Sequence, residues 1–351
     1  MQITHERVME LLASIKHPAM KQDIVSLGIA QEVAVEGNAV SFILRLIEPN
    51  DAFGGSLLRA CKRALEAEYP GVEVRGSVQE AAPAKVEAPP RKGGVAGVKH
   101  IVAIASGKGG VGKSTITVNL AVALARRGHR VGVLDADVFG PSLPLMLGVV
   151  DARPEVINDE GEDLIIPVEA HGVRMLSMGF FVSPSDALVW RGPMASNGLK
   201  QILHMGLWGE LDYLLIDLPP GTSDIHLTVV QEMSLTGAVI VSTPQSVALA
   251  DAQKAISMFS NHEVNVPMLG LVENMAWFEA EELPGKRYYI FGKGGAESLA
   301  GELGIPFLGS VPIVEGIREG GDSGSPVASA DGPLAQAFDG LAAALEAQVN
   351  R

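Results

Sequence analysis

Residues 107–114 combine glycines with a closing lysine and serine at a spacing that binds nucleotide phosphates. They follow the apolar run IVAIA and read GKGGVGKS, which matches Gly-x-x-x-x-Gly-Lys-[Ser/Thr]. Backbone N–H groups of such a loop surround the phosphates, and a helix starting near Gly112 adds its positive end. Lys113 can reach the β and γ phosphates, and the Ser114 hydroxyl can ligate Mg²⁺. We predict a nucleoside triphosphate site made of Gly107, Lys108, Gly109, Gly110, Val111, Gly112, Lys113, Ser114 and Thr115.

Three aspartates are placed to complete this site. Asp135 and Asp137 end the apolar run VGVLDAD, where one carboxylate can hold the Mg²⁺ shell and the other can position an attacking water. Asp217 ends the run YLLID, which is the Walker B arrangement. We expect Ser114, Asp135 and Asp217 to hold Mg²⁺ and Asp137 to act in catalysis. The alternative for Asp137 is that it caps the following turn.

Asn274 and a second glycine cluster are weaker signals. Asn274 follows the run MLGLVE and can supply an amide that reads an adenine edge, or it can form an Asx turn. The cluster at 292–295 lacks a closing Lys-Ser pair, so it predicts a turn that enters the helix AESLAGEL.

The elements that must position these residues follow a regular order. From residue 99 onward, short apolar runs alternate with helical segments, which predicts an α/β P-loop domain over 99–351 with a mostly parallel sheet covered by helices on both faces. Ligands of such sheets bind at the carboxyl ends of the strands. The residues expected at those ends are Ser106, Asp135, Asp217 and Asn274.

The first part of the chain reads as a separate, small α+β domain over residues 1–78. It has an amphipathic helix, a β-hairpin around Gly37-Asn38, a helix at about 56–68 and a further strand. Cys61 lies on the apolar face of the second helix, which favours a buried core cysteine. Residues 79–98 are rich in Ala, Pro and Gly and predict a linker.

Composition narrows the function classes. The formal net charge is −14, which argues against a nucleic-acid surface or attraction to anionic lipid. No stretch approaches 18 uninterrupted apolar residues, so no membrane-spanning helix is expected. A single cysteine excludes an internal disulfide and favours a cytoplasmic protein.

Lys108 makes the glycine loop more specific. A lysine directly after the first glycine resembles the deviant Walker A loop of the MinD/ParA/nitrogenase-iron-protein class of ATPases. The resemblance implies that Lys108 reaches across a homodimer interface to the nucleotide of the partner. We therefore expect Lys108, Lys113 and Asp137 to be the catalytic residues.

A longer series of motifs resembles the Mrp/ApbC-type iron–sulfur cluster carrier ATPases. The series runs over about residues 99–330 and comprises GKGGVGKST, DADVFGPS, RGPM, DYLLIDLPPGTSD, STPQ, VENMAWF, IFGKGGAE, PFLGSVPI and IREGGDSGSPV. The resemblance implies a homodimer that hydrolyses ATP with Mg²⁺, binds a 4Fe–4S cluster and passes it to apoproteins. Residues 1–78 resemble the small domain often fused ahead of that ATPase.

This chain departs from the family at the cluster site. The family usually places Cys-x-x-Cys shortly after Glu-Asn-Met, whereas Ala280 and Leu283 occupy those places here. Clusters need thiolates, and Glu279, Glu281 and Glu282 are poor replacements, so no Fe–S ligand is identifiable.

The alternative is a positioning or partner-recruiting switch of the MinD/ParA kind that carries no cluster. Such proteins need a basic amphipathic tail or a DNA-binding surface. The C-terminal segment is amphipathic, but its polar face carries Asp339 and Glu346 rather than lysines. Its apolar face is made of Leu334, Phe338, Leu341 and Leu345.

Overall fold

The computed structural model describes residues 3–18, 21–46, 54–79, 95–138, 140–159, 162–181, 192–262, 264–280 and 285–350. The chain divides into two compact units, Met1–Pro89 and Pro90–Arg351. Each unit is described by itself.

The first unit is a three-stranded sheet with two helices. Its elements are α1 (His5–Ala13), β1 (Ala30–Glu36), β2 (Ala39–Arg45), α2 (Gly54–Glu68) and β3 (Glu73–Gln79). Strands β1 and β2 form the antiparallel hairpin that the sequence predicts, and β3 pairs parallel to β2. The apolar face of α2 is buried through Leu57, Cys61 and Leu65.

The second unit is built on an eight-stranded sheet in the order β15-β12-β11-β4-β10-β5-β9-β8. The strands are β4 (Val98–Ala105), β5 (Val131–Asp135), β8 (Val168–Ala170), β9 (Val173–Ser177), β10 (Leu211–Asp217), β11 (Gly237–Ser242), β12 (Met268–Glu273) and β15 (Phe307–Ser310). All neighbouring pairs are parallel except β8 with β9. The predicted fold class is therefore confirmed.

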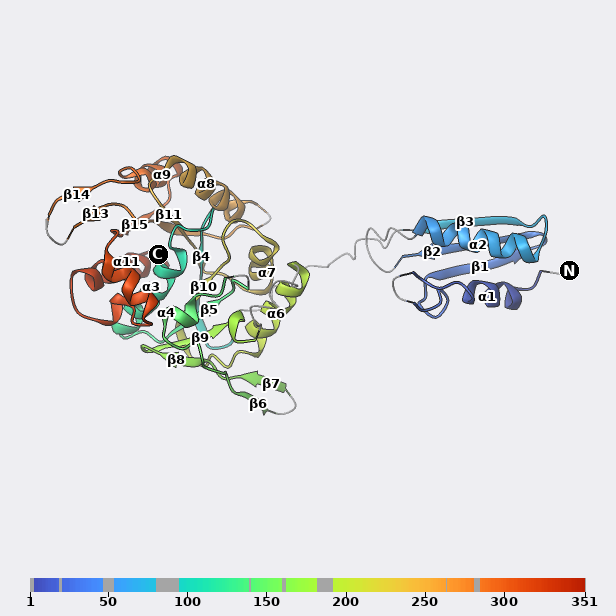
Figure 1. Cartoon of the computed structure of the whole chain (residues 1–351), viewed down its shortest axis with the longest axis horizontal. Coiled ribbons are helices and arrows are strands. Elements are labelled where there is room, and N and C mark those ends of the chain that lie inside the picture. The colour runs from blue at the N-terminus through green and yellow to red at the C-terminus, as the bar shows by residue number, and fades with distance from the viewer. Residues whose placement is uncertain are drawn as a thin grey trace. The chain divides into compact units, whose positions relative to one another are not determined.

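Helices cover both faces of this sheet (Figure 1). They are α3 (Lys113–Arg126), α4 (Leu143–Met146), α6 (Gly192–Met205), α7 (Asp224–Glu232), α8 (Ser246–Ser260), α9 (Gly295–Leu303), α10 (Glu315–Asp322) and α11 (Pro333–Val349). Side chains alternate along β4, so that Val102 and Ile104 pack with α3 and α11 while Ile101 and Ala103 pack with α6 to α9. This alternation divides the core into two apolar layers.

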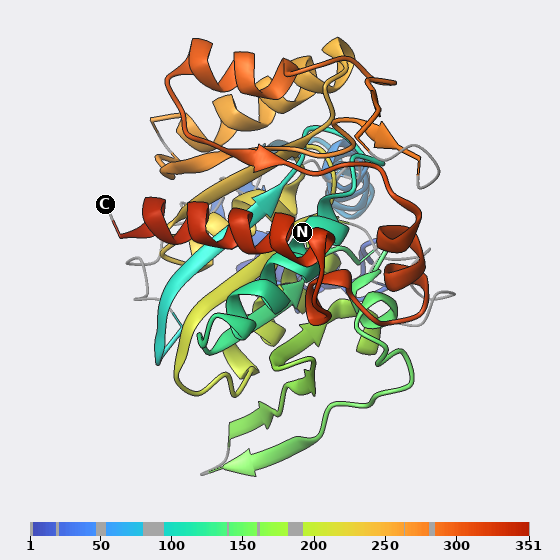
Figure 2. The same ribbon diagram turned by 90° about the vertical axis from the view of Figure 1, so that its left-hand side faces the viewer.

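The C-terminal helix α11 lies along α3 on one face of the sheet (Figure 2). Its apolar face is buried in the core through Phe338, Leu341 and Leu345. On its polar face, Glu346 and Asp339 accept hydrogen bonds from Arg127 at the end of α3. The amphipathic pattern of this segment is therefore explained by packing within the domain.

Two small hairpins were not expected from the sequence. They are β6 (Val156–Asp159) with β7 (Glu162–Ile165), and β13 (Phe278–Glu279) with β14 (Arg287–Tyr288). Their short, polar strands carry little alternation, which is the signal that reveals a strand. Within the described ranges, no helix has both the length and the apolarity needed to cross a bilayer.

Candidate nucleotide site

The predicted site residues meet at one edge of the sheet. Ser106, Asp135, Asp217 and Asn274 lie at or directly after the carboxyl ends of β4, β5, β10 and β12. In the register of the sheet Asp217 lies opposite Asp135 on β5 and Ile104 on β4. Parallel pairing therefore collects groups that are up to 168 positions apart, from 106 to 274, at a single edge.

The loop between β4 and α3 needs glycine for two reasons. Gly110 and Gly112 have φ angles of 80° and 79°, in the left-handed region that favours glycine. Gly107 is required for packing, since a Cβ there would lie 2.1 Å from the backbone carbon of Asp251 in α8. The glycines thus allow both the backbone conformation of the loop and its close packing against α8.

A buried cluster of polar groups stands behind this loop. Lys113 Nζ lies 2.7 Å from Asp217 Oδ2, and the Ser114 hydroxyl donates to the same oxygen at 2.7 Å. Thr117 Oγ1 lies 2.6 Å from Asp217 Oδ1. Asp217 is fully buried and Lys113 is only 6% exposed. Removing one member of such an ion pair leaves a buried charge uncompensated, at a cost of about 3–5 kcal/mol.

Thr117 was missed in the sequence analysis. It lies four residues after Lys113, on the same face of α3, and its hydroxyl reaches the Walker B carboxylate. The i, i+4 spacing from the loop lysine is the signal that could have revealed it.

Asp135 is buried beside this cluster. One of its carboxylate oxygens accepts from the Ser177 hydroxyl on β9 and from the backbone N–H of Leu143. Burial, followed by the negative charge of Asp217, raises the pKa of Asp135. Burial thus disfavours the ionised form of Asp135, and a bound cation would favour it.

The donor set at this edge fits Mg²⁺. Ser114, Asp135 and Asp217 offer hydroxyl and carboxylate oxygens, which Mg²⁺ prefers. The assignment of these three residues as ligands remains a prediction.

A cavity of about 220 Å³ opens over the loop. It is lined by loop residues from Lys108 to Thr115 together with Asp137, Ser142, Met146 and Pro220. Asp137 Oδ1 also accepts from the Gly140 N–H at 3.1 Å. Asp137 thus caps its turn and faces the cavity at once, so the two interpretations of this residue are compatible.

Lys108 is half-buried and lines the same cavity. Its backbone carbonyl accepts from the Ser106 hydroxyl at 3.0 Å, which fixes the start of the loop. The action of its side chain across a dimer interface remains a prediction.

Asn274 supports the loop from the neighbouring strand. Its Nδ2 donates to the Val111 carbonyl at 2.8 Å, and a Cβ at Gly112 would lie 2.2 Å from the same nitrogen. A second cavity of about 290 Å³ adjoins it, lined in part by Thr115, Met275 and Pro312. The amide nitrogen is thus engaged with the loop, and adenine recognition by Asn274 remains a prediction.

The segment after Glu-Asn-Met forms the β13–β14 hairpin. Glu279 Oε1 accepts from the Gly285 N–H at 2.6 Å, and the Arg287 guanidinium lies 4.2 Å from the centre of the Trp277 ring. Ala280 is described, whereas Leu283, Glu281 and Glu282 lie outside the described residues.

The described residues offer few side chains that could bind an iron–sulfur cluster or another metal centre. Among the residues that the structure describes, no group of three or more His, Cys, Asp or Glu side chains is placed to hold a metal ion. Burial raises the pKa of the Cys61 thiol, the only cysteine of the sequence, to about 12. Cys61 is therefore a neutral core thiol at physiological pH.

Comparison with known proteins agrees with this geometry. The family described as NUBPL iron-transfer P-loop NTPase matches residues 97–346, and the family described as iron-sulfur cluster assembly protein matches residues 5–76. A relative from Synechocystis sp., named iron-sulfur cluster carrier protein, is 44% identical over 326 residues, 93% of this chain and 91% of its own.

Solved structures show the same fold. A nucleotide-binding protein from Archaeoglobus fulgidus in complex with ADP is 41% identical, with a TM-score of 0.56 over 65% of this chain and 87% of its own. The septum site-determining protein MinD from Pyrococcus horikoshii, complexed with Mg-ADP, is 27% identical, with a TM-score of 0.51 over 69% of this chain and 94% of its own. The family expected from the motifs is confirmed, and the chain belongs to the NUBPL-type iron-transfer P-loop NTPases.

Proposed function

We propose that this protein is an ATP-hydrolysing carrier that binds iron–sulfur clusters and transfers them to apoproteins. The observation that carries the ATPase part is the buried cluster of Lys113, Ser114 and Asp217 behind a glycine loop of this family. The cargo is inferred from the relatives, which are named for it.

The reaction we propose is in-line attack of water on the γ phosphate of ATP. Lys113 exchanges its ion pair with Asp217 for the β and γ phosphate oxygens, and the loop N–H groups bind the same phosphates. Asp137, which faces the cavity over the loop, positions the attacking water. Lys108 of a second copy adds positive charge as the bond between the γ phosphorus and the β–γ bridging oxygen breaks and ADP leaves.

Mg²⁺ would be held by Ser114, Asp135 and Asp217 and would neutralise phosphate charge when bound. Asp135 must then be ionised, against the preference that burial imposes. The hydrogen-bond donors that face Asp135 include the Asp137 and Leu143 N–H groups and the Ser177 hydroxyl, and the two backbone donors favour the ionised form.

In this proposal the adenine base occupies the cavity of about 290 Å³ beside the loop. Gly112 and Thr115 of the phosphate loop line that cavity, and so do Asn274, Pro312 and Ile313. Because Asn274 Nδ2 is engaged with the loop, its carbonyl oxygen is the atom left to accept from the base.

The carrier role includes a homodimer and apoprotein recipients. The resemblance of the loop around Lys108 to the deviant Walker A class supports the dimer, and the name of the relatives supports delivery. We also propose a cytoplasmic setting, since the sequence holds a single cysteine.

A second candidate function is an ATP-dependent switch that recruits partners and carries no cluster. The observation in its favour is the lack of a thiolate: Cys61 is buried and protonated, and Ala280 stands where the family usually has cysteine. A dimer would hold two cysteines, because each copy has only Cys61, which lies in the first unit of the chain.

Anaerobic reconstitution with iron and sulfide separates the two candidates. The carrier is supported by bound iron and acid-labile sulfide, visible absorbance and transfer to an apoprotein, with Lys113→Ala as the matched variant. ATP hydrolysis without a bound or transferred cluster would favour the switch. Absence of both hydrolysis and cluster would refute both candidates.

A further inference from the structure

A third cavity, of about 330 Å³, opens at the opposite edge of the sheet from the nucleotide site. Its lining includes Val95, just before β4, and Trp208, just before β10. The seven residues of β10 separate it from Asp217, a span of about 20 Å. The cavity is therefore distinct from the phosphate loop and from the adjoining base cavity.

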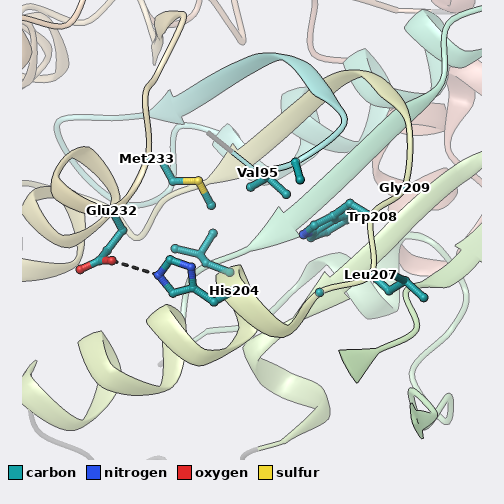
Figure 3. A pocket seen from close by; sticks show the side chains of 10 residues that line it. Val95, His204, Leu207, Trp208, Gly209, Glu232 and Met233 are labelled. Atoms are coloured by element: carbon teal, nitrogen blue, oxygen red, sulfur yellow. Dashed lines mark hydrogen bonds and ion pairs between the residues drawn. The ribbon is translucent and has the colours of Figure 1, made fainter. Parts of the chain in front are cut away.

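Trp208 gives this cavity a buried hydrogen-bond donor, its indole Nε1–H. Its side chain is 1% exposed, and among the described residues no acceptor lies within hydrogen-bonding distance of the indole Nε1–H. A buried donor of this kind is unfavourable unless a ligand or ordered water accepts from it. In Figure 3 the indole nitrogen faces the space between Val95, Met233 and His204.

At the rim of the cavity, the carboxylate of Glu232 is paired with two basic side chains. His204 Nε2 lies 3.0 Å from one carboxylate oxygen of Glu232, and Lys200 Nζ lies 2.8 Å from the other (Figure 3 shows the first pair). Lys200 and then His204 lower the pKa of Glu232, so this carboxylate is ionised and already paired. The charges at this rim are thus paired with one another, and the indole of Trp208, which can only donate, favours a ligand that accepts a hydrogen bond over a cation.

The walls between the indole and the rim are apolar. Val95, Leu203 and Met233 contribute them, and the volume falls at the lower end of the range of small-molecule sites. A few convergent polar groups inside an apolar pocket are the usual composition of such a site.

We propose that this cavity binds a small organic acid. Its apolar body packs against Val95, Leu203 and Met233, one carboxylate oxygen accepts from the Trp208 indole N–H, and its charge lies beside His204. The proposal is independent of the nucleotide site and of the cluster cargo.

The test is an NMR titration of the full chain labelled with ¹⁵N at its tryptophan indoles. The sequence holds three tryptophans, so Trp190→Phe and Trp277→Phe assign the Trp208 signal. The probes are 3-phenylpropanoate, its amide 3-phenylpropanamide, and 3-phenylpropylammonium, which shares the apolar body but cannot accept a hydrogen bond.

We expect 3-phenylpropanoate to shift the Trp208 signal saturably, about tenfold more tightly than the amide, and the ammonium ion to leave it unchanged. The Trp277 signal serves as the internal control and should not move. The proposal is overturned by no saturable shift at Trp208, by equal binding of the ammonium ion, or by an amide that binds as tightly as the acid.

Two variants test the geometry. His204→Ala removes a half-exposed rim group and should weaken binding of the acid about fivefold, whereas His262→Ala, an exposed histidine outside the cavity, should not. Gly206→Ala places a Cβ 2.6 Å from Trp208 Nε1 and should abolish the shift. Because Gly206→Ala can also disturb the core, its circular dichroism spectrum is first compared with that of the wild type. An unchanged affinity for the acid in His204→Ala is sufficient to contradict the proposed orientation, whatever Gly206→Ala shows.

Discussion

The phosphate-loop edge and the β13–β14 hairpin occupy the two positions where this family is expected to handle ATP and cluster, and they are built differently. At the loop edge, Lys113, Ser114 and Asp217 are buried and in direct contact. On the hairpin, the contact of Arg287 with Glu279 spans 3.7 Å between partly exposed side chains. Exposed ion pairs of this kind contribute about 0–1 kcal/mol to stability. Among the described residues of the two regions, only those at the loop edge therefore form a strong ion pair whose lysine a bound phosphate could attract.

The difference indicates that the residues proposed for nucleotide chemistry are in place in this chain independently of any site for the cargo. The polar residues that the nucleotide site needs are present and in contact, whereas the hairpin offers aromatic rings and cations such as Trp277 and Arg287 in place of thiolates. Changes at the loop edge should therefore have large effects on ATP, and changes in the hairpin should have small ones.

The largest effect is expected for Lys113→Ala. Loss of the charge that we propose binds the β and γ phosphates should weaken ATP binding about 10³-fold, or ~4 kcal/mol. Isothermal titration calorimetry with a non-hydrolysable ATP analogue measures it, with the exposed Lys254→Ala as control. Affinity within threefold of wild type would remove Lys113 from the site.

Asp137→Ala should separate binding from turnover. We expect ATP hydrolysis to fall about 100-fold, because the carboxylate that we propose positions the water is gone, while affinity stays within a few-fold. Steady-state phosphate release measures the rate. Normal turnover would show that Asp137 only caps its turn with Gly140.

His226 lies in the segment after Asp217 and makes the stability of the folded state depend on pH. Burial lowers the pKa of His226 to about 4, and its Nδ1 accepts from the Ser223 N–H at the start of α7. Between pH 6.5 and 4 the unfolded state binds the proton more tightly, so the stability of the folded state falls as the pH drops through this window.

His226→Gln should remove that dependence, since glutamine can accept the same cap hydrogen bond without titrating. The loss of unfolding free energy from pH 7 to pH 5 should be about 2 kcal/mol smaller in the variant than in wild type. Urea unfolding of nucleotide-free protein at the two pH values measures this difference. Equal losses in both proteins would show that His226 is not held neutral by burial.

Lys108→Ala tests the second copy. If the lysine acts across a dimer, the hydrolysis rate at high protein concentration should fall about tenfold while ATP affinity of the dilute protein is retained. Measuring turnover against protein concentration distinguishes these cases. Equal loss of affinity and rate at every concentration would place Lys108 within its own subunit.

The smallest effect is expected for Arg287→Ala in the hairpin. The change removes an exposed contact with Trp277 and should alter unfolding free energy by less than about 1 kcal/mol, with ATP affinity unchanged. A thermal shift assay with and without ATP measures both. A large loss of ATP affinity would show that the two regions are coupled.

Much of the nucleotide site was predictable from the sequence because its signals are local. The spacing from Gly107 to Ser114 and the acids that end β5 and β10 fix both the chemistry and the edge at which the groups meet. The hairpin around Gly37-Asn38 was predictable for the same reason, since a turn and two alternating runs are adjacent in sequence.

Contacts between distant segments were not predictable. The Ser177 hydroxyl reaches Asp135 only because β9 pairs with β5, and Asn274 reaches Val111 from 163 positions away. The indole of Trp208, which has no hydrogen-bond partner among the described residues, is likewise a consequence of how the start of β4 and the ends of α6 and α7 lie near one another. Such features arise from tertiary packing, for which a single sequence carries no local pattern.

The most direct test of the proposed function is the iron and acid-labile sulfide bound per chain after strictly anaerobic reconstitution, followed by transfer to an apoprotein with and without ATP. The account predicts bound iron and sulfide in the wild type and transfer that responds to ATP, with Lys113→Ala losing the response to ATP. Wild-type protein that hydrolyses ATP but neither binds nor transfers iron and sulfide would contradict the carrier role.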